Sequence, residues 1–181
     1  MGNAKEIIDF WFSETSQKLW FNSTNDFDRE IQDRFEITYE DAKNGLLQDW
    51  EATPEGSLAL VILFDQFPLN MYRGDKKSFE TESLSREVAS RSIEKFQDQV
   101  LPLSKRAFLY IPFMHSENIA DQDRSVVLFK ASDLKENLRF AEHHRKIIQD
   151  YGRFPHRNSI LGRKNTPEEE IYLNSGKAFF G

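Results

Sequence analysis

Three short segments combine a proline, an aromatic ring and hydrogen-bonding side chains, a mixture that the interior of a helix does not require. They are residues 65–74 (DQFPLNMYRG), 112–117 (PFMHSE) and 152–158 (GRFPHRN), and the third continues to Arg163. We call them the first, second and third motif. Such segments either fold into turns whose polar groups satisfy one another or contribute to a ligand site.

The third motif is basic in a chain that is otherwise acidic. Residues 151–165 contain no Asp or Glu, although the whole chain has 30 of them. The guanidinium groups of Arg153, Arg157 and Arg163 suit carboxylates and phosphates, which they bind through two parallel hydrogen bonds. Asn158 would add a neutral contact, and the glycines allow an irregular backbone whose N–H groups face a ligand. The motif therefore predicts an anion pocket.

A buried ion-pair network is the alternative interpretation of the same arginines. In that case they pair with carboxylates of this chain, at Asp65, Glu117, Asp121 or Asp123, and tie helix ends together.

The first motif follows a strongly apolar helix. Pro68 lacks a backbone N–H, so we expect the helix to end near Phe67, with Asp65 and Gln66 in its last turn. A helix dipole disfavours an anion at that end unless a cation compensates it. We expect an arginine of the first or third motif to be that cation, which would bring these two motifs together.

The second motif offers histidine and carboxylate chemistry. His115 and Glu117, with Asp121 and Asp123 soon after, could hold a divalent metal ion, with His144 or His156 completing the shell. Alternatively, a carboxylate orients His115 as a general base. No standard catalytic, phosphate-binding or dinucleotide-binding motif is present, so we assign no metal ligands, and no cofactor follows from the sequence.

The two remaining histidines carry less chemistry. His144 lies on the apolar stripe of its helix, which predicts a hydrogen-bonded histidine in the core. Its neighbour His143 is expected to face solvent.

The hypothetical site draws on all three motifs. Its acid–base group consists of His115, His156 and Asp65. Its ligand-binding group consists of Gln66, Asn70, Tyr72, Arg73, Glu117, Arg153, Arg157, Asn158 and Arg163.

Helical periodicity dominates the elements that must position these residues, and no stretch alternates long enough to predict a strand. We predict an all-α fold of eight or nine helices in a single domain over residues 1–181. Helix-start signals occur at Asn3, Thr53, Asp133 and Thr166, and stop signals at Gly45 and Gly152. The expected helices cover approximately residues 3–12, 26–45, 53–66, 83–96, 103–111, 126–129, 133–152 and 166–173, and the apolar tail 178–181 is expected to dock.

Composition excludes several classes of partner. The net charge of −6 argues against nucleic acid and against an anionic membrane surface. The longest apolar run, residues 58–64, is too short to cross a bilayer. The chain has no cysteine and shows no apolar leader, which favours a soluble, cytoplasmic protein. Oligomeric state does not follow from the sequence.

The three motifs, in this order, resemble the characteristic blocks of a mainly bacterial family known as domain of unknown function 924. Residues 9–12 (DFWF) and 166–169 (TPEE) fit the same pattern, so the resemblance spans nearly the whole chain. It implies a compact, tetratricopeptide-like fold of stacked antiparallel helix pairs, and it implies no activity. Leu69 stands where the family pattern has an arginine, which weakens an anion site at that position.

Three functions remain open at this point. The motifs could converge on a pocket for a small anionic molecule, with or without catalysis. They could line a groove that grips a peptide or its carboxylate. They could also be purely structural. The exposure of Arg157 and His156 distinguishes these functions. Both side chains should converge and be accessible in a pocket, lie apart along the wall of a groove, or be buried if the motifs are purely structural.

Overall fold

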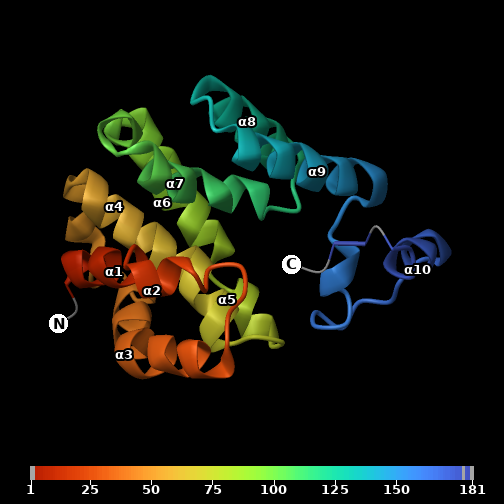
Figure 1. Cartoon of the computed structure of the whole chain (residues 1–181), viewed down its shortest axis with the longest axis horizontal. Coiled ribbons are helices and arrows are strands. Elements are labelled where there is room, and N and C mark those ends of the chain that lie inside the picture. The colour runs from red at the N-terminus through yellow and green to blue at the C-terminus, as the bar shows by residue number, and fades with distance from the viewer. Residues whose placement is uncertain (1–2, 177, 180–181) are drawn as a thin grey trace. The chain divides into compact units, whose positions relative to one another are not determined.

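The computed structural model describes residues 3–176 and 178–179, and every regular element in this part of the chain is helical (Figure 1). The predicted all-α class is confirmed. The α-helices are α1 (Ala4–Trp11), α2 (Glu14–Gln17), α3 (Asn25–Lys43), α4 (Pro54–Val61), α5 (Phe67–Met71), α6 (Glu82–Glu94), α7 (Leu103–Met114), α8 (Ile119–Ala131), α9 (Lys135–Tyr151) and α10 (Pro167–Leu173).

Short helices of other types complete the fold. Four are 3₁₀ helices: η1 (Gln48–Ala52), η3 (Lys76–Phe79), η4 (Gln97–Val100) and η5 (Pro155–Arg157). The π-helical turn η2 (Ile62–Gln66) joins α4 to α5 without a break. If α4, η2 and α5 count as one rod, the described residues form nine α-helical rods, within the predicted eight or nine.

The chain divides into two compact units, and each is described by itself. The N-terminal unit comprises residues 1–73 and 77–112, and the C-terminal unit comprises residues 74–76 and 113–181. The single domain stays a prediction, as does the tetratricopeptide-like stacking of helix pairs.

Aromatic side chains build the core of the N-terminal unit. The rings of Phe10, Phe35 and Phe67 pack with centroids 5.0–6.2 Å apart, and Trp11 joins them through Phe67 at 5.7 Å. Helix α4 packs against α1, α6 and η1, while α3 packs against α5. Phe27, Ile31, Phe35 and Tyr39, spaced four residues apart along α3, are all buried. Tilted and edge-to-face ring pairs therefore contribute to this core beside its aliphatic side chains.

Pro68 does not end its helix, so that prediction was wrong. The helix continues through η2 and α5 to Met71. In place of the missing Pro68 N–H, the carbonyl of Phe64 accepts a hydrogen bond from the Thr81 hydroxyl at 2.7 Å. The π-turn and a side chain from elsewhere in the unit therefore compensate for the proline.

The C-terminal unit contains the helical hairpin of α8 and α9, which pack side by side, and the short helix α10 (Figure 1). Helix α8 is longer than the predicted 126–129. Its buried face includes the polar residues Gln122 and Ser125 beside Phe129, so an apolar pattern underestimates it. Asn118 caps it by accepting the Ala120 N–H at 2.8 Å.

Asp133 does not cap α9, contrary to prediction. The cap position is Leu134, which makes no side-chain cap bond, and Asp133 has a φ of 53°. The short connection between α8 and α9 requires a left-handed residue there, and aspartate is one of the residue types that tolerate that conformation. The stop at Gly152 (φ 71°) and the capping box of Thr166 with Glu169 are as predicted.

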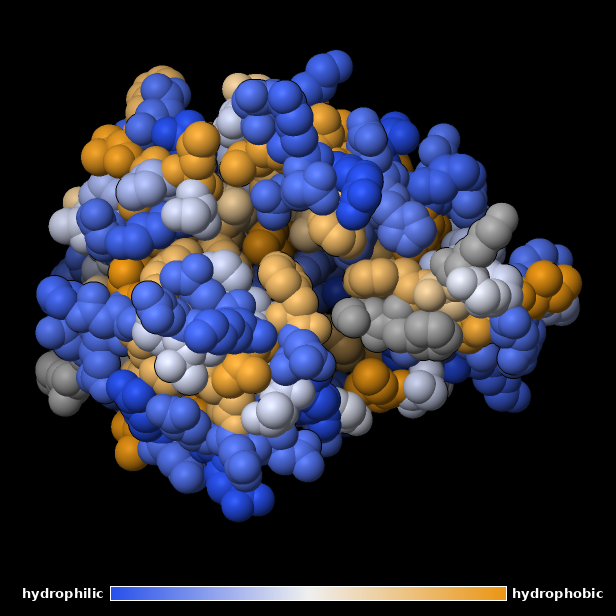
Figure 2. Space-filling view, viewed as in Figure 1, coloured by the Kyte–Doolittle hydropathy of each residue, from blue (hydrophilic) through white to orange (hydrophobic). Residues whose placement is uncertain are grey.

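The exposed surface is mostly hydrophilic on the face shown in Figure 2, where apolar side chains are scattered among polar ones. No helix among the described residues is long and apolar enough to cross a membrane.

Candidate functional site

The third motif forms an irregular loop between α9 and α10. Gly152 ends α9 in a left-handed conformation, residues 155–157 form η5, and Gly162 is left-handed again with a φ of 66°. This backbone leaves the polar side chains of the loop to be satisfied by tertiary contacts. Two carboxylates from outside the loop supply many of these contacts.

Glu117 joins the second motif to the third. Its carboxylate accepts two hydrogen bonds from Arg163, at 2.6 and 2.9 Å, and one from the Phe154 N–H at 2.8 Å. Burial raises the pKa of Glu117, but the Arg163 fork and the Phe154 N–H outweigh it and leave the pKa below its ordinary value. Glu117 therefore pairs with an arginine of the third motif, as the ion-pair interpretation predicts.

Glu169 is the second carboxylate that holds the loop. It accepts hydrogen bonds from Arg153 at 2.6 and 2.8 Å, from Asn158 at 3.1 Å and from the Thr166 N–H at 2.7 Å. The Arg153 hydrogen bonds are the main reason why the pKa of Glu169 falls to about 2. The carboxylate is almost fully buried. Arg153 therefore neutralises a carboxylate of this chain, that of Glu169.

The centre of the loop is aromatic. The guanidinium of Arg157, which is 6% exposed, lies 4.7 Å from the ring centroid of Phe154. The imidazole of His156 lies beside the same ring at 5.5 Å and beside Phe179 at 5.2 Å. A buried cation over an aromatic face is favourable because the ring face carries negative charge density.

His156 is neutral at physiological pH. Burial lowers its pKa first, the positive charge of Arg157 lowers it further, and Glu117 opposes the shift, which leaves the pKa at about 4. Its Nδ1 is buried and has no hydrogen-bond partner among the described residues. A half-buried neutral imidazole can donate or accept at that nitrogen, depending on the tautomer.

His144 is the predicted core histidine. It is 4% exposed, and its Nδ1 lies 2.7 Å from the Phe140 carbonyl oxygen. Burial dominates and lowers its pKa to about 3, so the neutral ring donates Nδ1–H to that carbonyl. His143 is exposed, as predicted. His115 is half-buried, and its charge would lower the pKa of both His144 and His156.

Several buried polar atoms of the third motif have no hydrogen-bond partner among the described residues. They include His156 Nδ1, Asn158 Oδ1 and Arg163 Nε. Buried polar atoms usually find a protein or water partner, so a group of them within eight residues calls for an explanation. A ligand or ordered water at the loop is one.

Side chains of α8 hold the second motif through hydrogen bonds. Gln122 donates to the carbonyl oxygens of Met114 and Ser116, at 2.7 and 2.6 Å, and the Ser116 hydroxyl donates to Asp121 at 2.6 Å. Asp123 pairs with Arg145 at 2.5 Å.

Residues 65–73 of the first motif belong to the N-terminal unit and have their own partners there. Arg73 forks onto Asp28 at 2.7 and 3.2 Å and donates to Asn70 at 3.2 Å. Buried Asp65 accepts the Gln66 amide at 2.5 Å. The convergence of the first and third motifs stays a prediction.

Tyr72 completes the first motif. Its hydroxyl donates to Glu36 at 2.9 Å, and Lys77 lies 4.0 Å from its ring centroid. Burial raises the pKa of Tyr72 to about 12, so the phenol keeps its proton.

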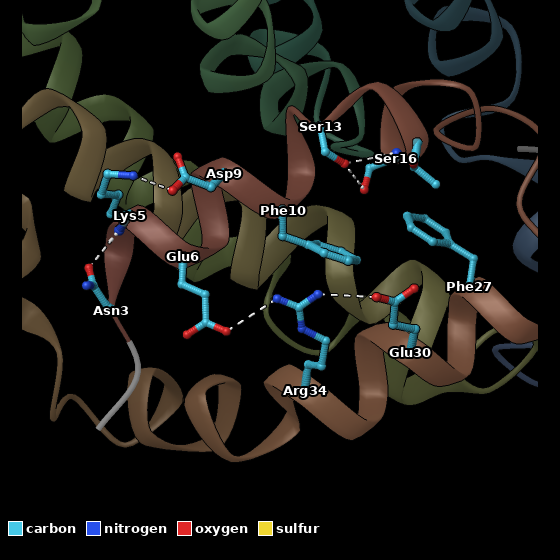
Figure 3. Close-up of a pocket in the computed structure, with 11 residues that line it drawn as sticks. Asn3, Lys5, Glu6, Asp9, Phe10, Ser13, Ser16, Phe27, Glu30 and Arg34 are labelled. Carbon is cyan, nitrogen blue, oxygen red and sulfur yellow. Dashed lines mark hydrogen bonds and ion pairs between the residues drawn. The ribbon is translucent and has the colours of Figure 1, made fainter.

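Two clefts open on the N-terminal unit, and the motif residues do not line them. The first, between α1 and α3, has a volume of about 520 Å³. In Figure 3, Arg34 lies between Glu6 and Glu30, and its guanidinium is 4.6 Å from the ring centroid of Phe10. The Arg34 guanidinium is therefore already paired with both carboxylates.

The second cleft, which we call the α4–α6 groove, has a volume of about 780 Å³. Apolar residues of α4, η2 and α6, such as Leu60, Phe64 and Val88, contribute to its lining. Of its cations, Arg91 forks onto Glu51 with both distances 2.8 Å, and Lys43 pairs with Glu80 at 2.8 Å.

Two residues of the loop region were not predicted as part of a site. The sequence indicates Glu169 only as part of a helix start. Its ion pair with Arg153, 16 positions earlier, does not follow from local spacing. Phe179 gives no signal beyond an apolar tail. Across the described residues, no three His, Asp or Glu side chains come together to hold a metal ion.

Comparisons with known proteins agree with this fold. A family model described as bacterial protein of unknown function (DUF924) matches residues 7–177. The chain is also similar to a protein of unknown function from Agrobacterium tumefaciens, with 41% identity and a TM-score of 0.91, over 96% of this chain and 97% of that one. None of the curated proteins matches. These descriptions assign no ligand and no activity.

Proposed function

We propose, from the premise that this chain belongs to the bacterial DUF924 family, that the third-motif loop binds a small molecule carrying a carboxylate or a phosphate. The observation that carries the proposal is the group of three buried, unsatisfied polar atoms at His156, Asn158 and Arg163.

The donor and acceptor types of these atoms suit an anion. Arg163 Nε–H is a donor, and His156 Nδ1 is a donor in one tautomer, so both serve an anionic oxygen. Asn158 Oδ1 accepts, which suits a hydroxyl or an acidic proton on the same ligand. The Glu117 and Glu169 ion pairs hold the loop that presents these atoms, because they fix it at both ends.

We propose a binding function for the loop rather than a catalytic one. With a pKa of about 4, His156 is neutral at pH 7, so it holds no acidic proton for transfer, but its ring still donates one hydrogen bond and accepts another. Catalytic roles for His115 and Asp65, and ligand contacts from the first motif, stay predictions.

A thermal-shift screen tests the binding proposal. The panel contains inorganic phosphate, phosphorylated metabolites and carboxylic acids, each tested on wild type and on His156→Phe. A ligand at ~100 times its dissociation constant should stabilise wild type by about 2.7 kcal/mol, a shift on the order of 5–10 °C at this chain length.

The variant pair decides the result. His156→Phe keeps an aromatic ring beside Phe179 and removes both nitrogens, so it should lose the shift while staying folded. His143→Phe, on an exposed position of α9, is the matched control and should keep it. A shift that survives in His156→Phe would remove this loop as the binding site.

The α4–α6 groove favours a second candidate, an interaction module that grips a peptide. Its apolar lining is flanked in sequence by Leu46 and Phe96, which are 71% and 67% exposed. Exposed apolar side chains beside a groove are typical of interaction sites. Peptides selected from a display library on wild type should lose binding to Leu84→Glu, a substitution on the groove wall. Equal binding by both proteins would reject this candidate.

We also propose a cytoplasmic location without nucleic-acid partners. The absence of cysteine and the net charge of −6 support both points.

A further inference from the structure

Phe179 fills a slot built from imidazole rings. Its ring centroid lies 4.5 Å from that of His144 and 5.2 Å from that of His156, at interplanar angles of 66° and 84°. The exposed ring of His143 is 6.1 Å away. Phe154 completes the neighbourhood, because it contacts both His144 and His156 at 5.6 and 5.5 Å. Edge-to-face packing of this kind is specific for a flat aromatic ring.

The slot adjoins the polar atoms of the proposed site. His156 belongs to both: its ring faces Phe179, and its buried Nδ1 has no hydrogen-bond partner among the described residues. A molecule that hydrogen-bonds to this nitrogen therefore places its remaining atoms beside the ring slot.

Among the described residues, one hydrogen bond and several apolar contacts hold Phe179 in the slot. Its backbone N–H donates to the Tyr172 hydroxyl at 2.9 Å, and its half-buried ring packs against the cluster of Ile147, Ile148 and Phe154. These are few contacts for a large side chain, so a competing ring can replace them at modest cost.

We infer that Phe179 acts as an internal substitute for the ring of the ligand, and that the ligand is an aromatic carboxylate or phosphate. The ring of the ligand replaces Phe179 between the imidazoles, and its anionic group reaches His156 and Arg163. This inference rests on the proposed function and narrows its ligand class.

Two probes and two proteins test the inference. Phenyl phosphate has the ring and the anion, and inorganic phosphate has the anion alone. Their dissociation constants are measured by calorimetry on wild type and on Phe179→Ala. Because the variant has no ring to displace, phenyl phosphate should bind it at least about tenfold more tightly than wild type. The affinity for inorganic phosphate should change by less than about threefold.

A second readout needs no ligand. Diethyl pyrocarbonate modifies neutral, accessible imidazoles, and mass spectrometry locates the product. His156 should react faster in Phe179→Ala than in wild type, measured against a histidine peptide added to both reactions, and phenyl phosphate should protect it. Phe21→Ala, at a position that is 88% exposed in the N-terminal unit, is the control for losing a phenylalanine.

The outcomes separate the two proposals. If neither probe binds wild type or variant, and His156 reactivity is insensitive to both, the proposed function fails and this inference fails with it. If both probes bind and Phe179→Ala leaves the affinity for phenyl phosphate unchanged, the inference about Phe179 fails and the proposed function stands. If Phe179→Ala does not fold, Phe179→Leu keeps the apolar contact and loses the aromatic edge, and the same comparison decides the matter.

Discussion

At the scale of single residues, Glu117 does more than neutralise a charge. It receives the guanidinium fork of Arg163 and the backbone N–H of Phe154, so one carboxylate fixes both a side chain and the entry to η5. Glu117→Gln should lower the free energy of unfolding by about 2–3 kcal/mol, because it leaves half-buried Arg163 without its counter-charge. Urea denaturation measures this change.

A surface pair supplies the control for that substitution. Glu136 pairs with Arg139 on the exposed side of α9, with both side chains at least 72% exposed. Glu136→Gln should change the free energy of unfolding by less than about 0.5 kcal/mol. Equal effects of the two substitutions would mean that the Glu117 pair does not stabilise the loop.

The residue-scale predictions succeeded where the local pattern carried the information. His144 sits on an apolar stripe, so its burial and its backbone hydrogen bond could be predicted from spacing alone. Glu117 was among the expected partners of the third-motif arginines. The role of Phe179 depends on tertiary contacts with His144 and His156, which no local spacing encodes.

At the scale of elements, the helix from α4 to α5 depends on a hydroxyl from outside it. Thr81 donates to the Phe64 carbonyl, the group that Pro68 cannot serve. Thr81→Val keeps the shape and leaves that carbonyl unsatisfied in the core, so it should cost about 1–3 kcal/mol in thermal or urea unfolding.

Ser85 offers a graded comparison on the same helix surface. Its hydroxyl donates to the Val61 carbonyl at 3.4 Å, a longer and weaker bond. Ser85→Ala should therefore cost less than Thr81→Val. The reverse order would contradict the role given to Thr81.

The turn between α8 and α9 stores backbone strain at Asp133. Its φ of 53° suits glycine better, and its ion pair with Lys135 is a long contact of 3.7 Å on the surface. Asp133→Gly should be neutral or stabilise the protein by up to about 1 kcal/mol. Asp133→Val should destabilise it, because a β-branched residue resists that conformation. Calorimetric melting of the two variants provides the test.

Helix starts and stops were predictable to the extent that their signals are local. Thr53, Gly152 and Thr166 act through their immediate neighbours, and the structure agrees with each. The helix end predicted at Pro68 was wrong because the Thr81 hydroxyl satisfies the Phe64 carbonyl that Pro68 cannot serve. The predicted α8 was too short because the buried face of this helix includes the polar residue Gln122. Local rules fail where tertiary contacts satisfy the backbone.

At the scale of the whole molecule, stability should depend on pH through the buried histidines. The pKa values of His144 and His156 fall from 6.5 to about 3 and about 4 on folding. Between about pH 4 and 6.5 the unfolded chain binds these two protons and the folded chain does not, so stability is lost as the pH falls. The slope near pH 5 should reach about 2.7 kcal/mol per pH unit.

Glu169 adds to the same trend at lower pH, because its folded pKa of about 2 lies below the ordinary value of 4.5. Its contribution is fully present above about pH 4.5 and is lost as the pH falls toward 2. His156→Phe should remove about half of the slope near pH 5. Urea titrations at several pH values measure this, with His143→Phe as the control, and an unchanged slope in His156→Phe would contradict the assignment.

The central claim is that the third-motif loop binds an anion through His156, and histidine nitrogen NMR tests it most directly. Protein labelled with ¹⁵N at histidine is titrated with inorganic phosphate at pH 7, and long-range ¹H–¹⁵N spectra follow each imidazole. Saturable shifts are expected for the signals that disappear in His156→Phe, which assigns them to the His156 nitrogens, and the His143 signals should stay unchanged. His156 signals that stay in place in the folded protein, up to high phosphate, would contradict it and leave the loop as a structural lock.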